Sequence, residues 1–127
     1  MIERKIITTD KAPKAIGPYS QALLAGSTLY ISGQIGMDPT TGKFVEGSTA
    51  EQTKQALENI KAILAAADME LKHVVQAQVL LADMSDFAKM NEVYASYFTG
   101  DFPTRAAFGA ADLPAGAKVE ILATAIK

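Results

Sequence analysis

The chain has 127 residues, of which 49% are hydrophobic, and its 12 basic and 14 acidic residues give a formal net charge of −2. We expect a single domain over residues 1–127, with apolar side chains enough for a core and a subunit interface. No block of like charge occurs, and this argues against nucleic-acid binding, which usually needs a clustered basic face. The absence of cysteine excludes disulfides, thiolate metal ligands and a cysteine nucleophile. No segment resembles a signal peptide or a membrane span, so we expect a cytoplasmic protein.

The first third of the chain alternates between short strand-like segments and loops. We expect strands at residues 5–9, 19–24 and 28–32. Ala25-Gly26-Ser27 separates the second and third of these segments, which predicts a hairpin. Residues 11–18 and 33–47 are rich in proline and glycine and are therefore predicted loops.

A well-marked helix is predicted from Thr49 to Ala67. Ser48 and Glu51 have the spacing of a capping box at its start. Apolar residues follow at helical spacing and predict one buried stripe: Ala56, Leu57, Ile60, Ile63, Leu64 and Ala67.

The second half predicts one more helix and three strands. The helix spans Asp86 to Phe98, and its expected buried side carries Phe87, Met90, Tyr94, Tyr97 and Phe98. The strands are expected at residues 74–82, 104–108 and 117–126. The order β-β-β-α-β-α-β-β indicates an α+β fold, with a mixed sheet and two helices on one face.

Two charged residues stand in the last two predicted strands among mainly apolar neighbours. They are Arg105 and Glu120, and charged side chains are seldom buried unless they are paired or bind a ligand. They could form a structural ion pair or simply face water. They could instead form a site in which Arg105 holds a small anion and Glu120 handles a proton or a water molecule.

Period-two alternation predicts where these side chains point. Glu120 shares a face with Leu122, opposite Val119 and Ile121. If the helices cover the other face, this partly apolar face is expected to meet another subunit. Arg105 shares a face with small residues, which predicts open space beside its guanidinium group.

Two other features carry simple structural interpretations. His73 is the only histidine and lies at a predicted helix-to-strand junction, so we expect a solvated or junction-capping role. Without a second histidine or a cysteine, no zinc site can be named. Gly33-Gln34-Ile35-Gly36 is not followed by the Lys-Ser/Thr pair of a phosphate-binding loop.

Three blocks of the sequence closely resemble the RidA/YjgF family of enamine/imine deaminases. They lie in order and at the family's separations along almost the whole chain. The blocks are Ala15 to Ala22, Tyr30 to Gly36, and the C-terminal set Pro103-Thr104-Arg105, Leu113-Pro114 and Val119-Glu120-Ile121.

The resemblance implies a chorismate-mutase-like α+β fold and a homotrimer with a central barrel and three clefts between subunits. It implies cofactor-free hydrolysis of 2-imino acids, the tautomers of 2-aminoacrylate- and 2-aminocrotonate-type enamines, to 2-keto acids and ammonia. These small molecules are released by pyridoxal-phosphate dehydratases, so the implied role is metabolite detoxification. Neither nucleic acid nor membrane is an implied partner.

The resemblance also assigns roles to individual residues. Arg105 is the implied carboxylate clamp, because its planar fork donates two parallel hydrogen bonds. The backbone N–H of Gly33 is expected to approach the same carboxylate. Glu120 is the implied proton-handling group, and a base, an acid or an anchor for water all fit the residues.

The remaining implied site residues are Tyr19, Ser32, Asn91 and Ala107. Tyr19 and Ser32 offer hydroxyl groups, and Asn91 matches an amide that lines the family's cleft. The family's best-known members carry cysteine at the position of Ala107. The contact assigned there is made by the backbone carbonyl, which alanine retains, but a thiol-based role is lost.

Two other classes of function remain as alternatives. In a non-catalytic sensor of keto or imino acids, Arg105 would be required but Glu120→Gln would leave ligand affinity intact. Chaperone-like and RNA-cleaving roles have also been ascribed to family members. The acidic balance argues against RNA, and a chaperone role should be insensitive to Arg105→Ala.

Overall fold

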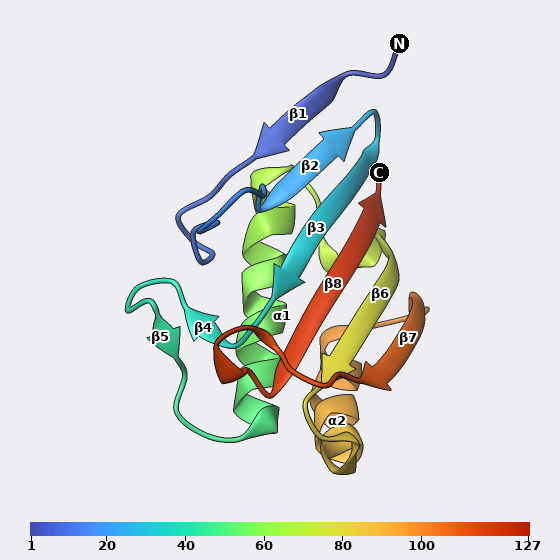
Figure 1. Cartoon of the computed structure of the whole chain (residues 1–127). Coiled ribbons are helices and arrows are strands. Elements are labelled where there is room, and N and C mark those ends of the chain that lie inside the picture. The colour runs from blue at the N-terminus through green and yellow to red at the C-terminus, as the bar shows by residue number, and fades with distance from the viewer.

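Six strands form one mixed sheet in the computed structural model, which describes residues 1–127 (Figure 1). In spatial order the strands are β1 (Arg4–Ile7), β2 (Ala22–Ala25), β3 (Thr28–Gln34), β8 (Val119–Ile126), β6 (Val74–Leu81) and β7 (Thr104–Gly109). Neighbouring strands are antiparallel except β6 and β7, which run parallel. The last strand of the chain therefore lies in the interior of the sheet, and β7 forms one edge.

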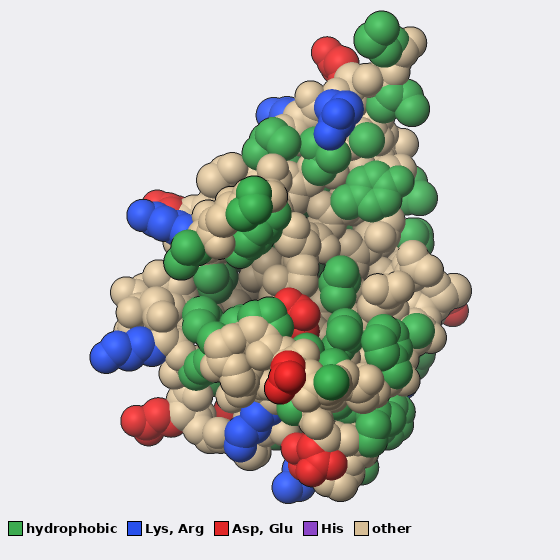
Figure 2. Space-filling view, in the orientation of Figure 1, with side chains coloured by type: hydrophobic (Ala, Val, Ile, Leu, Met, Phe, Trp, Pro, Cys, Tyr) green, Lys and Arg blue, Asp and Glu red, His purple; other side chains and the backbone are tan.

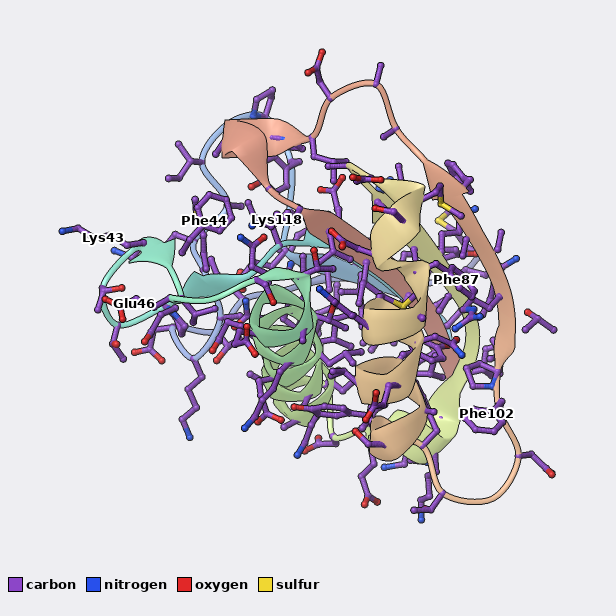
Figure 3. All side chains as sticks on the ribbon, turned by 90° about the horizontal axis from the view of Figure 1, so that it is seen from below. Lys43, Phe44, Glu46, Phe87, Phe102 and Lys118 are labelled. Atoms are coloured by element: carbon purple, nitrogen blue, oxygen red, sulfur yellow. The ribbon has the colours of Figure 1, made fainter.

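Two helices pack side by side on one face of this sheet, as the sequence predicts. They are α1 (Thr49–Ala66) and α2 (Phe87–Tyr97), and Figure 3 shows both on the same side of the strands. Three short 3₁₀ turns complete the regular structure: η1 (Leu71–His73), η2 (Met84–Asp86) and η3 (Pro114–Gly116). The expected α+β architecture is confirmed.

The two faces of the sheet differ in what covers them. On the helix face, Ile31, Ala77 and Ala123 are buried against the helices. The opposite face, which carries Tyr30 and Leu122, has no helix over it and is called the open face below. Because side chains alternate along a strand, every second one enters the core and the others lie on the open face.

Local sequence signals explain the helices and the core. The backbone N–H of Ser48 donates to Glu51 Oε1 at 2.7 Å, which forms one half of the predicted capping box and starts α1. The apolar stripe of α1 then joins strand residues in a core of 21 buried hydrophobic side chains. The buried members of this α1 stripe are Ala56, Leu57, Ile60, Ile63 and Leu64.

Several predicted boundaries are wrong, and each error has a local cause. β2 begins at Ala22 rather than Tyr19, because Tyr19 lies in a turn in which its N–H donates to the carbonyl of Gly17 at 2.9 Å. The last strand begins at Val119 rather than at residue 117, since η3 extends to the N–H of Ala117. The predicted loop over residues 33–47 also contains a small ribbon formed by β4 (Met37–Asp38) and β5 (Lys43–Phe44).

A β-bulge interrupts β3 beside β8. Ile31 pairs with Ala123 and Gln34 pairs with Ile121, so Ser32 and Gly33 together oppose Leu122. A bulge of this kind bends its strand and redirects nearby groups. It places the backbone of these two residues directly beside the segment of β8 that carries Glu120.

The close approach of the β3–β4 connection to α1 depends on Gly36. A Cβ atom at this position would lie 2.7 Å from Cα of Gln52, a backbone atom that cannot move aside. We expect Gly36→Ala to lower the free energy of unfolding by about 1–3 kcal/mol, the usual cost of overpacking. Urea unfolding monitored by circular dichroism measures this change.

Gly109→Ala is the matched control for this substitution. The nearest atom to its added Cβ would be Cγ of Met84 at 3.2 Å, in a flexible side chain that can shift. Equal destabilisation by the two substitutions would contradict the proposed contact between Gly36 and the α1 backbone.

Candidate functional site

A pocket of about 530 Å³ opens on the open face, between the loop that precedes β2 and the strands β3 and β8. Four of the predicted site residues line it: Tyr19, Ser32, Gly33 and Glu120. Figure 2 shows this side of the molecule, with hydrophobic side chains around central acidic groups and basic side chains scattered near the rim. The pocket thus combines apolar walls with a few polar groups, as small-molecule sites do.

Glu120 supplies the carboxylate of this pocket. It lies on β8 opposite Leu80, with its side chain on the open face as the alternation predicts. Partial burial raises the pKa of Glu120 above its ordinary value, and it has no ion-pair partner. A carboxyl group in this state can hold or release a proton closer to neutral pH than an exposed one.

The bulge in β3 makes room for this carboxylate. A Cβ atom on Gly33 would lie 2.5 Å from Oε2 of Glu120, so a larger residue would displace the carboxylate from its place against the backbone. Next to it, Oγ of Ser32 donates to the carbonyl oxygen of Ser20 at 2.6 Å. The Ser32 hydroxyl proton is therefore engaged, and this bond ties β3 to the segment that carries Tyr19.

The buried amide of Gln21 holds the outer wall of the pocket. Gln21 is 3% exposed, and its Oε1 accepts from the N–H of Thr9 at 2.7 Å. Its Nε2 donates to the carbonyl oxygens of Thr9 at 3.0 Å and Pro13 at 2.7 Å. Nothing in the sequence marks Gln21 as part of the site: it lies in the block Ala15 to Ala22, but a glutamine beside a strand does not indicate where its amide points.

Arg105 lies on the other face of the sheet. It pairs in register with Ala77, which pairs with Ala123, and both of these residues are buried on the helix face. Its Nη1 donates to Oδ1 of Asn91 on α2 at 2.8 Å. Asn91, which the resemblance implies as a cleft-lining amide, is therefore a direct neighbour of Arg105.

The open space expected beside the guanidinium group is present only in part. The guanidinium carbon of Arg105 lies 4.8 Å from the ring centroid of Tyr94 and 5.6 Å from that of Phe87. Small residues on β7 leave room, and two rings of α2 occupy part of it while Arg105 stays exposed. Ala107, on the same face of β7, is half-buried and packs against the core.

The predicted site residues thus form two groups on opposite faces of one sheet. Tyr19, Ser32, Gly33 and Glu120 belong to the open-face pocket, whereas Arg105, Asn91 and Ala107 lie at the β7 edge on the helix face. Arg105 and Glu120 form no ion pair within the chain. The structural ion pair considered from the sequence is therefore absent.

The remaining polar candidates have structural roles or form no cluster. Nδ1 of His73 accepts the N–H of Glu70 at 2.9 Å, which confirms the junction-capping interpretation. No group of three or more His, Cys, Asp or Glu side chains is placed to hold a metal ion. None of the helices is both long enough and apolar enough for a membrane span.

The chain is similar to known proteins over nearly its full length. Residues 9–127 match the family model described as Endoribonuclease L-PSP. A curated Bos taurus protein named 2-iminobutanoate/2-iminopropanoate deaminase is 57% identical over 124 residues, which cover 98% of this chain and 90% of that protein.

Two solved structures are similar along nearly the full length. The crystal structure of RidA from an Antarctic Psychrobacter species has a TM-score of 0.93 and 48% identity, covering 97% of this chain and 99% of that one. The structure of Escherichia coli TdcF with bound serine has a TM-score of 0.93 and 40% identity, covering 97% and 98% of the two chains. The fold is therefore shared over almost every element described above.

The raised pKa of Glu120 makes stability depend on pH. The folded chain holds this proton more tightly than the unfolded chain, whose glutamate titrates near the ordinary value of 4.5. The stabilising contribution of the protonated form is complete below pH 4.5 and is lost as the pH rises through the folded-state pKa. We expect Glu120→Gln to have the higher melting temperature at neutral pH and to lose this advantage on acidification.

Thermal unfolding of both proteins across the acidic and neutral range checks this prediction. Glu92→Gln, at an exposed position on α2, controls for the removal of a surface carboxylate. An advantage for Glu120→Gln that is constant with pH would show that ionisation of Glu120 is not its source.

Proposed function

The chain belongs to the RidA/YjgF family, and on this premise we propose that it hydrolyses 2-imino acids to 2-keto acids and ammonia. Curated relatives from Bos taurus and Homo sapiens, 57% and 55% identical, carry the name 2-iminobutanoate/2-iminopropanoate deaminase. The substrate is a small carboxylate with a C=N bond beside the carboxyl carbon. The solved relative TdcF holds serine, which carries a carboxylate of the same kind.

The observation that carries the proposal is the unpaired charge of Arg105. Its neighbours are the neutral amide of Asn91 and two aromatic rings, and no acidic side chain lies within ion-pair distance. A guanidinium group held by neutral contacts keeps its charge available for a ligand. Its planar fork matches a carboxylate with two parallel hydrogen bonds, which gives orientation as well as affinity.

Glu120 and the open-face pocket support the chemical step. Water adds to the imine carbon, and one of its protons passes through Glu120 to the nitrogen. The resulting carbinolamine then expels ammonia and leaves the keto acid. A carboxyl group whose pKa is raised by burial is suited to both directions of this proton transfer. The imine carbon is already electrophilic and needs no further activation. Water is the only co-reactant, and the atoms balance because its oxygen becomes the keto oxygen while the nitrogen leaves as ammonia.

Opposite faces of one sheet cannot hold a single small substrate, so the proposal requires a second copy of the chain. The β7 edge of one copy would bring Arg105 to the open-face pocket that contains Glu120 of the next copy. Large apolar side chains exposed on these two surfaces support such a contact: Phe102 and Phe108 near β7, and Tyr30 and Ile126 on the open face. A heterologous contact closes into a ring where the rotation between copies permits it, and the ring we propose is the homotrimer implied by the family resemblance.

Imine hydrolysis fits the pocket better than cleavage of RNA. A protein that binds RNA neutralises successive phosphates with several basic side chains. Lys14 is the only basic residue that lines the open-face pocket. Since a 2-imino acid is short-lived in water, its source must be close at hand. A pyridoxal-phosphate dehydratase acting on serine or threonine would supply it.

A dehydratase-coupled assay measures turnover. A threonine dehydratase generates the imine, semicarbazide competes for it, and release of 2-ketobutyrate is followed. We expect wild-type protein to accelerate release, Arg105→Ala and Arg105→Lys to lose most of this acceleration, and Glu120→Gln to lose roughly 10²- to 10⁴-fold in rate. Retained acceleration in Arg105→Ala would refute the carboxylate clamp. A wild-type protein that binds 2-ketobutyrate without turnover would support the sensor instead.

Co-expression of two variants tests whether each site spans two chains. Arg105→Ala and Glu120→Gln are co-expressed with different affinity tags, and assemblies carrying both tags are purified. In a trimer that carries both tags, one of the three clefts combines an intact Arg105 with an intact Glu120. We expect recovery of roughly that share of wild-type activity. If both residues acted from the same chain, every cleft would lack one of them and activity would stay absent.

A further inference from the structure

We propose that Tyr94 and Phe87 are positioning residues that orient Arg105 for recognition of the substrate carboxylate. We call these two rings and the amide of Asn91 the arginine seat. The inference rests on the proposed function, because it assumes that Arg105 binds a carboxylate. It adds to that function the physical means by which an exposed side chain on an edge strand is held in one orientation.

The arginine seat is built on one face of one helix. Phe87, Asn91 and Tyr94 are separated by four and three residues on α2, a spacing that aligns side chains along one face. Figure 3 shows Phe87 on the side of α2 that is turned toward β7. The guanidinium carbon of Arg105 lies 4.8 Å from the ring centroid of Tyr94 and 5.6 Å from that of Phe87, within the range of cation–π attraction.

Tyr94 contributes its ring and not its hydroxyl group. It is 3% exposed, and its ring packs against Phe98 with a centroid distance of 4.9 Å. Its buried hydroxyl has no hydrogen-bond partner, so no hydrogen bond links it to Arg105. Burial raises the pKa of Tyr94, and the positive charge of Arg105 partly opposes this rise, as expected for a cation near the ring. Phenylalanine should therefore replace tyrosine at this position without loss.

These contacts determine which part of Arg105 remains free. The guanidinium carbon lies near the rings of Tyr94 and Phe87, and one N–H of Nη1 donates to Asn91. The edge formed by Nε and Nη2 keeps parallel donors for a carboxylate. A freely rotating arginine would lose conformational freedom when it binds, and the seat removes part of that cost in advance.

The test compares Tyr94→Leu with Tyr94→Phe in the dehydratase-coupled assay. We expect Tyr94→Leu to raise KM roughly 5- to 30-fold, the fold-change that corresponds to losing a partly desolvated cation–π contact. Its kcat should change much less, because the open-face pocket is untouched. Tyr94→Phe should restore KM to within about twofold of wild type.

Tyr97→Leu is the matched control on the same helix. Its ring lies near Lys61 rather than Arg105, and we expect it to leave KM unchanged. If Tyr94→Leu does not fold, Phe87→Leu at the less buried ring carries the same test. An unchanged KM in the folded leucine variants, an equal rise in Tyr97→Leu, or failure of Tyr94→Phe to restore KM would overturn the proposal.

A readout that needs no turnover separates this inference from the proposed function. Nitrogen-15 NMR of the Arg105 side chain reports the ring-current shift and order of its Nε–H. We expect an upfield-shifted, ordered signal in wild type and Tyr94→Phe, and loss of both properties in Tyr94→Leu. An unchanged signal in Tyr94→Leu overturns the seat. Absence of wild-type turnover with a normal NMR result overturns the deaminase function alone.

Discussion

Successive side chains of a β-strand point to opposite sides of the sheet, and the arrangement of this protein's polar groups follows from that constraint. Arg105 and Glu120 both lie on strands of one sheet, but register places the first on the helix face and the second on the open face. Within one chain the two side chains therefore lie on opposite sides of the sheet, away from any shared small molecule. The helices, which cover only one face, leave the other face available for a second copy.

The placement of Arg105 and Glu120 on opposite faces also explains why neither forms an ion pair within the chain. Within ion-pair distance, Arg105 and Glu120 would neutralise each other, and neither would be free to act on a ligand. Instead Arg105 rests on neutral groups of α2, and Glu120 lies in a partly buried pocket that raises its pKa. Each charge is left without a counterion in its own chain. An assembly that joins the two surfaces would create a site with a cation at one end and a proton-handling group at the other.

The sequence predicted those features that depend on local spacing. The apolar stripe and capping signal located α1, and period-two alternation placed Glu120 on the face away from the helices. Strand ends were less predictable, because turns such as the one at Tyr19 depend on hydrogen bonds between backbone groups. The surroundings of Arg105 could not be predicted either: the helical pattern assigned Tyr94 to the buried side correctly, but it does not indicate which strand residue meets the ring.

The functional roles of four site residues remain predictions: Tyr19, Ser32, Gly33 and Asn91. Their assignment came from the family resemblance, and the structure adds the position of each one. Ser32 donates its hydroxyl proton to the backbone, and this favours a structural tie over proton transfer. Asn91 contacts Arg105 directly, which ties its proposed role to the clamp rather than to the pocket.

The Gln21 amide has a consequence for how a ligand would enter. Three backbone groups of Thr9 and Pro13 are fixed by this one buried side chain, so the segment beside the pocket is already ordered when the pocket is empty. Binding then requires no loop to fold over the ligand, and little conformational entropy is lost. A site of this kind has no loop-closure step to slow ligand capture. That property suits a substrate whose lifetime in water is short.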